Sequence, residues 1–308
     1  MNIKFWRFFF GFLVLSSALV WLFVFLSPDD KFHLVACNVG QGDAILAYYK
    51  DNQVLIDGGP GNRVLDCLSR HMPFWDRKIE MVVLTHPEAD HFSGLIEVFK
   101  RYNVGAFLAS PLESSSQGYQ LLKEEVGSRG VRVIEPDRGK NIGVGLMHFV
   151  ILHPSHQFLA ENSSLDTTSR NNQNVSVLGA RTTNRNLNEF SINLILSFGE
   201  FDALLTGDIV PSASGEVEEA FKSALVFIKD GKVEYLKVPH HGSKNGLTQD
   251  LLELVRPKIA VISVGKNSYG HPSPEILKML ENAGASVFQT KEMGDVEVIS
   301  DGLRWRIR

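Results

Sequence analysis

The chain has 308 residues, of which 44% are hydrophobic and 21% are charged, and its formal net charge is −4. This length and composition are ordinary for a globular protein and suffice for one large core or two modest ones. The negative charge excludes a protein that coats duplex DNA by charge alone, since such proteins are basic. Any contact with nucleic acid must therefore be local.

The N-terminal segment predicts a membrane anchor. Residues 8–26 carry no charge, and as a helix they are long enough to cross about 30 Å of hydrocarbon. Lys4 and Arg7 precede this segment, and a positive flank stays in the cytoplasm, so we expect the rest of the chain to be extracytoplasmic. A cleaved signal peptide is the alternative, although its apolar region would be shorter and no small-x-small cleavage site follows. We therefore divide the chain into an anchor or signal peptide, residues 1–28, and a domain, residues 29–308.

After the anchor, β-rich runs alternate with helical patterns. Strands are predicted at residues 32–37, 44–49, 53–56, 79–84, 105–108, 131–134, 147–152, 191–198, 201–205, 235–238, 259–264, 286–288, 296–299 and 303–307. Helices are predicted at residues 62–70, 92–102, 119–128, 217–225, 247–255 and 274–283. The two halves have similar content, which favours an α/β four-layer sandwich with helices outside and two mixed sheets inside.

Residues 155–189 interrupt this alternation. The segment is rich in Ser, Asn, Thr and Arg and lacks apolar periodicity. Long loops inside compact domains are uncommon and are usually functional or disordered. We interpret the segment as a polar surface insertion near the active site, with an insert of no special role as the alternative.

The two cysteines do not fix the cellular compartment. Cys37 lies in an apolar run and Cys67 in a predicted helix, and we expect two buried thiols rather than a bridge. Two cysteines alone do not make a disulfide framework.

The most informative segment follows the strand at residues 79–84. It places two histidines and two acidic residues within six positions, namely His86, Glu88, Asp90 and His91. Side chains two apart in an extended segment point to the same side. Such a crowd of donors suits divalent cations, and a metal-activated water is the usual nucleophile of a hydrolase. We predict a metal site here rather than helix caps or surface charges.

Two further strands end in ligand-type residues. Asp208 follows the strand at 201–205 and could bridge two cations, although a strand that ends in Gly-Asp is commonly only a turn. His240 and His241 follow the strand at 235–238. We predict His240 as the metal ligand because it lies nearest the strand end. Adjacent residues on a strand face opposite ways, so we expect His241 to form hydrogen bonds or donate a proton.

Other polar residues suit supporting roles. Asp57 ends the strand at 53–56 and could orient a ligating imidazole. His271 lies in a polar loop and suits substrate contact or general acid catalysis, with a turn histidine as the alternative. Lys244 and Lys266 could contact phosphate oxygens, or they are solvated surface charges.

Together these segments resemble the metallo-β-lactamase superfamily and, within it, the C-terminal hydrolase domain of ComEC-type DNA-uptake proteins. The resemblance covers residues 32–308 and rests on the order and spacing of six segments. These segments are residues 38–44, 56–59, 85–91, 205–208, 238–243 and 269–272.

The resemblance implies an αββα sandwich with the site at the mouth between the sheets. It also implies roles for matched positions: His86 and Glu88 at a first metal, Asp90, His91 and His240 at a second, Asp208 bridging the two, and Asp57 as a structural aspartate.

The chain departs from the superfamily pattern in two places. Glu88 stands where most members carry a histidine. The separate histidine expected before the Gly-Asp motif is missing, and Asn188 and Ser191 occupy that region. This oxygen-rich donor set allows Mn²⁺ as well as Zn²⁺, and either one ion or two.

The sequence therefore predicts a membrane-anchored, extracytoplasmic metal-dependent hydrolase of phosphodiesters such as DNA. Its cofactor is one or two divalent ions, Zn²⁺ or Mn²⁺, and no protein partner is predicted. We expect Asp90 to orient or deprotonate the attacking water, with His271 and His241 as further catalytic groups. Support of the ligands or contact with substrate is assigned to Asp57, Asn188, Ser191, Ser243, Lys244 and Lys266.

Two alternatives stay open. The first is a hydrolase of another bond, such as a lactone or a β-lactam. Those enzymes usually have nitrogen-richer sites, which argues against this alternative. The second is a non-catalytic binding module, because weak ligand sets in this superfamily can mark such modules.

Overall fold

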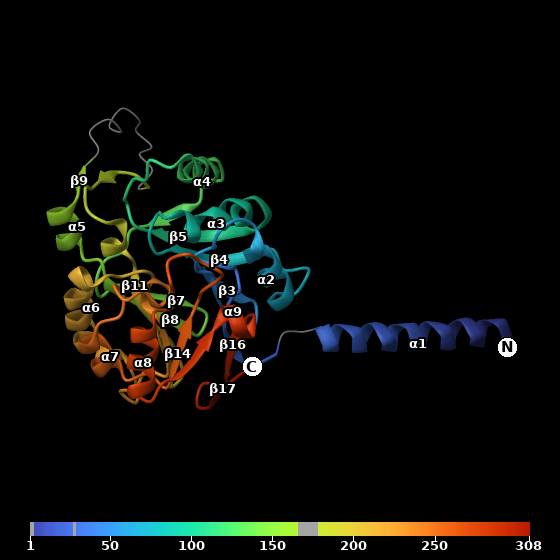
Figure 1. Ribbon diagram of the computed structural model, residues 1–308. Coiled ribbons are helices and arrows are strands. Elements are labelled where there is room, and N and C mark those ends of the chain that lie inside the picture. The colour runs from blue at the N-terminus through green and yellow to red at the C-terminus, as the bar shows by residue number, and fades with distance from the viewer. Residues whose placement is uncertain (1–2, 27–28, 166–177) are drawn as a thin grey trace.

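The computed structural model describes residues 3–26, 29–165 and 178–308 of the chain. An N-terminal helix stands apart from a globular part in which two sheets lie between layers of helices (Figure 1).

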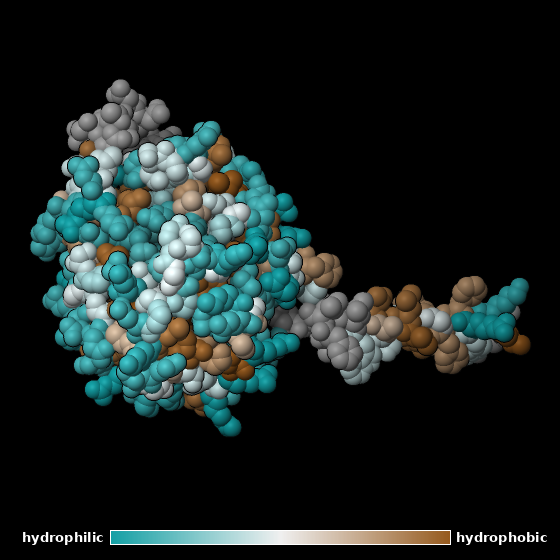
Figure 2. All heavy atoms as spheres, viewed as in Figure 1, coloured by the Kyte–Doolittle hydropathy of each residue, from teal (hydrophilic) through white to brown (hydrophobic). Residues whose placement is uncertain are grey.

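Helix α1 (Ile3–Leu26) is the N-terminal helix. Its segment Ile3–Trp21 is long and apolar enough to cross a membrane, and none of that segment is buried. Figure 2 shows hydrophobic side chains gathered along this helix, whereas the face of the globular part in view is largely hydrophilic. By length and composition the helix is consistent with the predicted anchor, and a signal sequence would share these properties.

The first sheet has eight strands in the order β17-β16-β1-β2-β3-β4-β5-β6. These strands are β1 (Phe32–Ala36), β2 (Ile45–Tyr49), β3 (Asn52–Ile56), β4 (Lys78–Leu84), β5 (Asn103–Ala109), β6 (Arg132–Ile134), β16 (Val296–Ser300) and β17 (Trp305–Ile307). Strands β3 to β6 are parallel to one another. Strand β1 is separated from β3 by the antiparallel β2 and so runs in the same direction as β3. The carboxyl ends of β1, β3, β4 and β5 therefore share one edge of the sheet, and their amino ends share the other.

The second sheet has seven strands in the order β15-β14-β13-β12-β11-β8-β7. These strands are β7 (Asn141–Val144), β8 (Met147–His153), β11 (Asn193–Phe198), β12 (Phe201–Leu205), β13 (Tyr235–Lys237), β14 (Ile259–Ile262) and β15 (Ser286–Gln289). Strands β12 to β15 are parallel, so their carboxyl ends also share an edge. A separate small ribbon joins β9 (Ser164–Leu165) to β10 (Arg181–Thr182).

Helices cover the outer faces of both sheets (Figure 1). The first sheet is covered by α2 (Arg63–His71), α3 (Ala89–Arg101) and α4 (Gln117–Ser128). The second sheet is covered by α6 (Pro211–Ala224), α7 (Gln249–Val255) and α8 (Pro274–Asn282). Two shorter helices, α5 (His156–Asn162) and α9 (Thr290–Met293), flank these layers.

The alternation of side chains along the strands produces the layers. In β3, Val54 and Ile56 join the core between the two sheets, whereas Leu55 joins the core beneath α2 and α3. In β4, Val83 points inward to the other sheet and Val82 outward to the helices. Strands buried on both faces need apolar residues at every position, which explains their continuous apolar runs. The predicted α/β four-layer sandwich is confirmed.

The boundaries differ from the prediction in informative places. Helix α3 begins at Ala89 rather than at residue 92, so Asp90 and His91 lie in its first turn. Asp90 and His91 in that turn are polar, so the turn has no apolar periodicity from which a helix could be predicted. Strand β7 and helices α5 and α9 were not predicted, because they are short and their apolar patterns are weak.

The expectation of two free thiols is wrong. Cys37 and Cys67 form a disulfide, with their Cα atoms 5.8 Å apart. The bond joins the end of β1 to α2. The two residues are 30 positions apart, and only the packing of α2 on the first sheet brings them together. Sequence spacing could not reveal this pairing.

Candidate metal centre

The candidate site lies where strand ends from both sheets meet. In the first sheet, Asp57 follows β3, and His86 and His91 follow β4. In the second sheet, Asp208 follows β12 and His241 follows β13. Side-chain donors of His86, His91 and Asp208 lie within 4.8 Å of one another. The carboxyl edges of the two sheets therefore meet at one mouth.

Three histidines present an unpartnered ring nitrogen to this mouth. The Nε2 atoms of His86, His91 and His241 are buried, and no hydrogen-bond partner is found for them in the described part of the chain. The opposite nitrogen is engaged: His91 Nδ1 lies 2.8 Å from the Asp57 carboxylate, and His241 Nδ1 lies 2.8 Å from the carbonyl of Ser263. A carbonyl only accepts, so His241 donates from Nδ1, and its neutral ring has a lone pair at Nε2. Metal-binding histidines are held in this way.

Asp57 connects two of these three histidines. Its Oδ1 accepts a hydrogen bond from the backbone N–H of Thr85 at 2.8 Å. Its Oδ2 accepts from the hydroxyl of Thr85 at 2.7 Å and contacts His91 Nδ1. Because the Thr85 hydroxyl donates to Asp57, its lone pairs are left for Nδ1 of His86, 3.1 Å away. Asp57 therefore lies where it can orient both imidazoles, directly for His91 and through Thr85 for His86.

Close backbone packing fixes the first turn of α3, which carries Asp90 and His91. The N–H of Gly58 donates to the carbonyl of His91 at 2.6 Å, and the N–H of Gly94 donates to the carbonyl of Gly59 at 2.9 Å. A Cβ atom at position 94 would collide with the carbonyl oxygen of Gly58. Only glycine permits this approach of the helix to the loop after β3.

The donors form two adjoining groups that share His91. One group contains His86, His91 and Asp208, and the other contains Asp90, His91 and His241. His241 Nε2 lies 3.4 Å from Asp90 Oδ2 and 3.2 Å from Asp208 Oδ2. His91 Nε2 lies 3.4 Å from the same Asp208 oxygen. Asp208 thus faces both groups, as the bridging role predicted for it requires.

His241, rather than His240, joins the donors. Both residues have left-handed backbone, with φ of 53° and 52°, in the turn Pro239–Gly242 that follows β13. The prediction assumed an extended strand with alternating side chains, but the turn directs His241 into the mouth. His240 is half-buried, and its ring centroid lies 6.3 Å from that of His241 and 5.7 Å from that of His271. The geometry therefore places His241 within a donor group, while a ligand role for His240, whose buried Nδ1 has no hydrogen-bond partner among the described residues, stays a prediction.

A buried ion pair behind the donors was not predicted. Lys237, at the end of β13, is 1% exposed and forms an ion pair with Asp43. Its Nζ donates to the carbonyl of Gly207 at 3.1 Å and lies 3.5 Å from Asp208 Oδ1. Asp43 in turn lies 3.5 Å from His241 Nδ1. The available signal was a lysine inside an apolar strand, because lysine is almost never fully buried without a partner.

Charges of both signs perturb the cluster. Burial alone would lower the pKa of His91 and of His241, but the surrounding carboxylates, Asp208 foremost, raise the pKa of both well above the usual value. Burial would raise the pKa of Asp43 and of Asp208, yet Lys237 and the two histidines lower it in both. In the metal-free state the imidazoles therefore hold protons that a cation must displace.

Two other predicted residues contact the first donor group, and a third lies close to one of them in the chain. Ser191 is buried, and its hydroxyl accepts from the backbone N–H of Asp208 at 3.1 Å and lies 3.3 Å from His86 Nδ1. Asn188 is buried, with its side-chain oxygen unpartnered among the described residues. Glu88 is the N-cap residue of α3, and its Oε2 lies 3.8 Å from His86 Nε2. Ser191 and Glu88 therefore lie beside the donors, and the supporting role of Asn188 stays a prediction.

The remaining predicted residues lie farther from the donors. Ser243 is buried, and its hydroxyl accepts from the backbone N–H of Asn245 at 3.2 Å. His271 is half-buried, and burial lowers its pKa. Lys244 and Lys266 are exposed, and neither makes an ion pair with a described residue. Their roles toward substrate stay predictions.

The polar segment 155–189 is described only in part. It contributes α5, the ribbon of β9 and β10, and a short 3-10 helix, Leu187–Phe190, that leads into Ser191. Residues 166–177, the middle of the predicted insertion, lie outside the described residues. That the segment serves the site stays a prediction.

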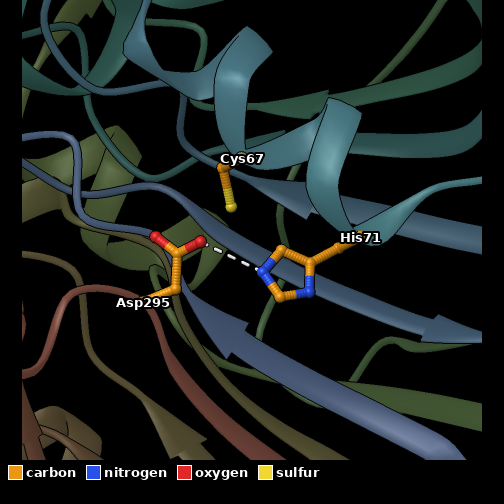
Figure 3. A group of neighbouring side chains, drawn as sticks. All are labelled: Cys67, His71 and Asp295. Atoms are coloured by element: carbon orange, nitrogen blue, oxygen red, sulfur yellow. Dashed lines mark hydrogen bonds and ion pairs between the residues drawn. The ribbon is translucent and has the colours of Figure 1, made fainter.

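A further group of potential donors lies beside α2 (Figure 3). Cys67, His71 and Asp295 approach one another there. The sulfur of Cys67 is already bonded to Cys37. Asp295 accepts from Arg70 at 2.7 Å and lies 3.0 Å from His71 Nε2. The group therefore links α2 to the loop before β16, and it leaves too few donors to hold a cation.

The match to a known family agrees with this fold and donor set. Residues 37–159 match the metallo-beta-lactamase superfamily. The fold is similar to that of YhfI from Bacillus subtilis, a metallo-beta-lactamase fold protein, with a TM-score of 0.53 and 10% identity over 87% of this chain and 100% of that one. The chain therefore has the metallo-β-lactamase fold, and the predicted resemblance to the superfamily is confirmed.

Two curated proteins are similar over most of the chain. ComE operon protein 3 of Bacillus subtilis (strain 168) is 24% identical over 91% of this chain and 34% of its own length. Recombination protein 2 of Haemophilus influenzae (strain ATCC 51907 / DSM 11121 / KW20 / Rd) is 25% identical over 85% of this chain and 28% of its own length. The chain thus spans about a third of the length of these relatives. The predicted resemblance to ComEC-type proteins is confirmed, and together with the fold it supports a metal-dependent hydrolase.

The donor set fits a divalent cation. Among the described residues, the Nε2 atoms of His86, His91 and His241 have no hydrogen-bond partner, and those of His91 and His241 lie 3.2–3.4 Å from carboxylate oxygens of Asp90 or Asp208. Mixed nitrogen and oxygen donors of this kind suit Zn²⁺ and harder ions such as Mn²⁺. A bound cation would coordinate the lone pairs of these buried groups that no hydrogen bond occupies.

Proposed function

We propose that the protein is a phosphodiesterase, with DNA as the leading substrate, and that it uses two divalent ions. The observation that carries this proposal is the pair of adjoining donor groups that share His91 and face Asp208. Two neighbouring cations suit in-line displacement at phosphorus, because they stabilise both the attacking and the leaving oxygen. The similarity to ComEC-type proteins supports a nucleic-acid substrate.

The two donor groups share His91, whose one free lone pair, at Nε2, can bind only one of the two ions because Nδ1 faces Asp57. His86 and Asp208 would hold one ion, with Glu88 beside His86. Asp90, His91 and His241 would hold the other, with Asp208 between them. When bound, the ions would lower the pKa of a coordinated water and neutralise developing negative charge.

The chain's own groups would perform the remaining steps. Asp90 is one-third exposed at the mouth, and its pKa is lowered: burial would raise the pKa, but His241 and His91 outweigh that effect. A carboxylate that stays ionised can orient a water molecule and accept its proton. His271 is half-buried with a lowered pKa, so it is neutral at pH 7 and can accept or relay a proton near the leaving group. Lys244 and Lys266 would contact phosphate oxygens.

We also propose that the domain is extracytoplasmic, attached by α1 as a single span. Lys4 and Arg7 precede the apolar segment and would stay in the cytoplasm. The disulfide between Cys37 and Cys67 supports this orientation independently, because such bonds persist mainly in oxidising compartments.

The test is hydrolysis by the full chain, purified in detergent and loaded with Mn²⁺ or Zn²⁺. We expect turnover of bis-p-nitrophenyl phosphate and cleavage of DNA, with a loss of about a hundredfold or more in Asp208→Ala and His241→Ala. Elemental analysis of the same samples should show the metal reduced in both variants and retained in His240→Ala.

Three results would contradict the proposal in different ways. A metal-loaded protein without phosphodiesterase activity that opens a lactone or a β-lactam would point to the other hydrolase class. A protein with no affinity for added metal would favour the binding module. Full turnover by Asp208→Ala would show that the proposed metal centre does not catalyse the reaction.

A further inference from the structure

A basic groove lies at the edge of the first sheet opposite the mouth. Its volume is about 740 Å³, and its lining includes five cationic residues. These are Arg77 before β4, Lys100 and Arg101 at the end of α3, Arg129 at the end of α4, and Arg132 at the start of β6. All five stand near the amino ends of parallel strands, whereas the donors of the metal centre stand at the carboxyl ends. In a chain with a net charge of −4, this concentration of positive charge is local.

The charge of the groove is only partly neutralised. Glu97 pairs with Lys100 at 3.0 Å and with Arg101 at 3.3 Å, and Glu125 pairs with Arg129 at 3.2 Å. Among the described residues, no carboxylate lies within ion-pair distance of the exposed side chains of Arg77 and Arg132. Five cations thus face two carboxylates, and the groove keeps a surplus of positive charge for an external anion.

An exposed aromatic pair stands beside the groove. Phe74 and Trp75 lie in the loop between α2 and β4, two residues before Arg77, and are 75% and 47% exposed. Their rings contact each other edge to face, with centroids 4.9 Å apart. Neighbouring apolar rings on a solvent-facing loop are costly in water. Aromatic side chains of this kind are enriched at the boundary between membrane and water.

The same edge receives the chain from helix α1. Strand β1 begins at Phe32, six residues after α1 ends at Leu26, and runs parallel to β4 in the same sheet. Two strands lie between β1 and β4, so their amino ends are about 15 Å apart at the usual strand spacing. Six residues of extended chain reach no farther than about 22 Å. A membrane that contains α1 would therefore lie within reach of the aromatic pair and the groove.

We propose that this edge docks on the membrane surface, with Phe74 and Trp75 in the interfacial layer and the basic groove on the phosphate groups of anionic lipids. Juxtamembrane basic clusters bind anionic lipid surfaces through the same attraction. Docking directs the opposite edge, and with it the metal centre, away from the bilayer. The inference requires that α1 is embedded in a membrane and is independent of the proposed hydrolysis.

The test follows the environment of Trp75 in the full chain, reconstituted into phosphatidylcholine vesicles with or without phosphatidylglycerol. Trp6, Trp21 and Trp305 are replaced by Phe so that Trp75 alone reports, and lipids with brominated acyl chains quench it on contact. We expect quenching that grows with the anionic lipid fraction and declines at high salt. Each groove charge removed should lower the ratio of docked to undocked protein about fivefold, or on the order of a hundredfold in the triple variant Arg101→Gln, Arg129→Gln, Arg132→Gln.

A matched control removes three exposed charges elsewhere, at Arg138, Lys278 and Lys291, and should leave the quenching unchanged. Equal quenching in the groove variant and the control, or a Trp75 that stays water-exposed in both, would overturn the proposal. Binding of a fluorescent oligonucleotide is measured in parallel. If the groove variant loses affinity for the oligonucleotide while Trp75 stays quenched, the groove is a nucleic-acid path and the membrane assignment is wrong.

Discussion

The two sheets supply the site in different ways. The first sheet contributes a contiguous cluster, in which His86, Asp90 and His91 come from one strand end and the helix that follows it. The second sheet contributes one residue from each of two strand ends, Asp208 and His241. In the first sheet, hydrogen bonds from neighbouring loops orient the donors. In the second sheet, the buried Lys237 offsets the negative charge of Asp208.

This difference shows which kind of support is more vulnerable. In the first sheet, Asp57, Thr85 and the close contact at Gly94 form a network of several hydrogen bonds, so that the loss of one bond leaves the others in place. In the second sheet, Lys237 is shared by Asp43 and Asp208, so one substitution leaves two buried carboxylates without their cation. We therefore expect the larger effects on folding in the second sheet and the more selective effects on metal binding in the first.

The largest effect should come from Lys237→Met. The substitution keeps an unbranched side chain, one atom shorter, but removes its charge, and breaking a buried pair typically costs about 3–5 kcal/mol. Chemical denaturation of the metal-free protein would measure this change. Added Mn²⁺ or Zn²⁺ should recover part of the loss, because a cation replaces some of the missing positive charge.

The double variant Lys237→Met, Asp43→Asn is the matched control. Removing both members of the pair should cost less than the sum of the two single changes. A metal-free Lys237→Met protein as stable as the original would mean that this pair does not support the second sheet's share of the site.

The next effect concerns the disulfide of the first sheet. Replacing Cys37 and Cys67 by Ser should lower the free energy of unfolding by about 2–4 kcal/mol, because the closed loop constrains the unfolded chain. Thermal unfolding with and without a thiol reductant would measure the change, and the reductant should not affect the variant. Metal affinity should be retained, since the disulfide holds α2 and not α3. If the variant lost metal affinity as well as stability, the disulfide would support the metal centre as well as the fold, and this expectation would be wrong.

A selective effect on metal binding should come from Asp57→Asn. The amide can still accept from Thr85 but orients His91 poorly, and loss of such an outer partner costs about 10–100-fold in metal affinity. Calorimetric titration of the metal-free protein would measure it, and circular dichroism would check that the fold is retained. Unchanged affinity would assign Asp57 a purely structural role.

A further effect depends on pH and belongs to the second sheet. Burial raises the pKa of Asp202 in β12 to about 6, and Glu234 adds to the rise. Because the folded pKa lies above the unfolded value of about 3.9, the stability associated with the protonated form is present below pH 4 and is lost as the pH rises through 6. Asp202→Asn should therefore gain up to roughly 3 kcal/mol at pH 8 over the original chain. Denaturant unfolding at pH 4 and pH 8 tests this, and an equal difference at both values would contradict it.

The sequence predicted the layers and the first sheet's share of the site for identifiable reasons. The short run at residues 79–84, apolar except for Glu80, is typical of a strand buried on both faces, and the alternation of such runs with helical patterns implies two covered sheets. The cluster of residues 86–91 can be recognised from the sequence because four donors stand within one loop and one helical turn.

The rest depended on convergence that no short segment encodes. The left-handed turn after β13 decides which of two adjacent histidines enters the mouth, and neither residue type demands that backbone. The disulfide joins Cys37 to Cys67 only because α2 packs on the first sheet. Lys237 and Asp43 are nearly 200 positions apart, and their pairing follows from the approach of the two sheets.

The contact between Gly94 and the loop after β3 has a consequence for how the protein tolerates change. At that position even a methyl group would force α3 outward, although it would touch none of the donors. Asp90 and His91 would move with the helix, while the rest of the sandwich stayed in place. A substitution there would leave a folded molecule with weakened affinity for the cation, a defect that measurements of folding alone would not detect.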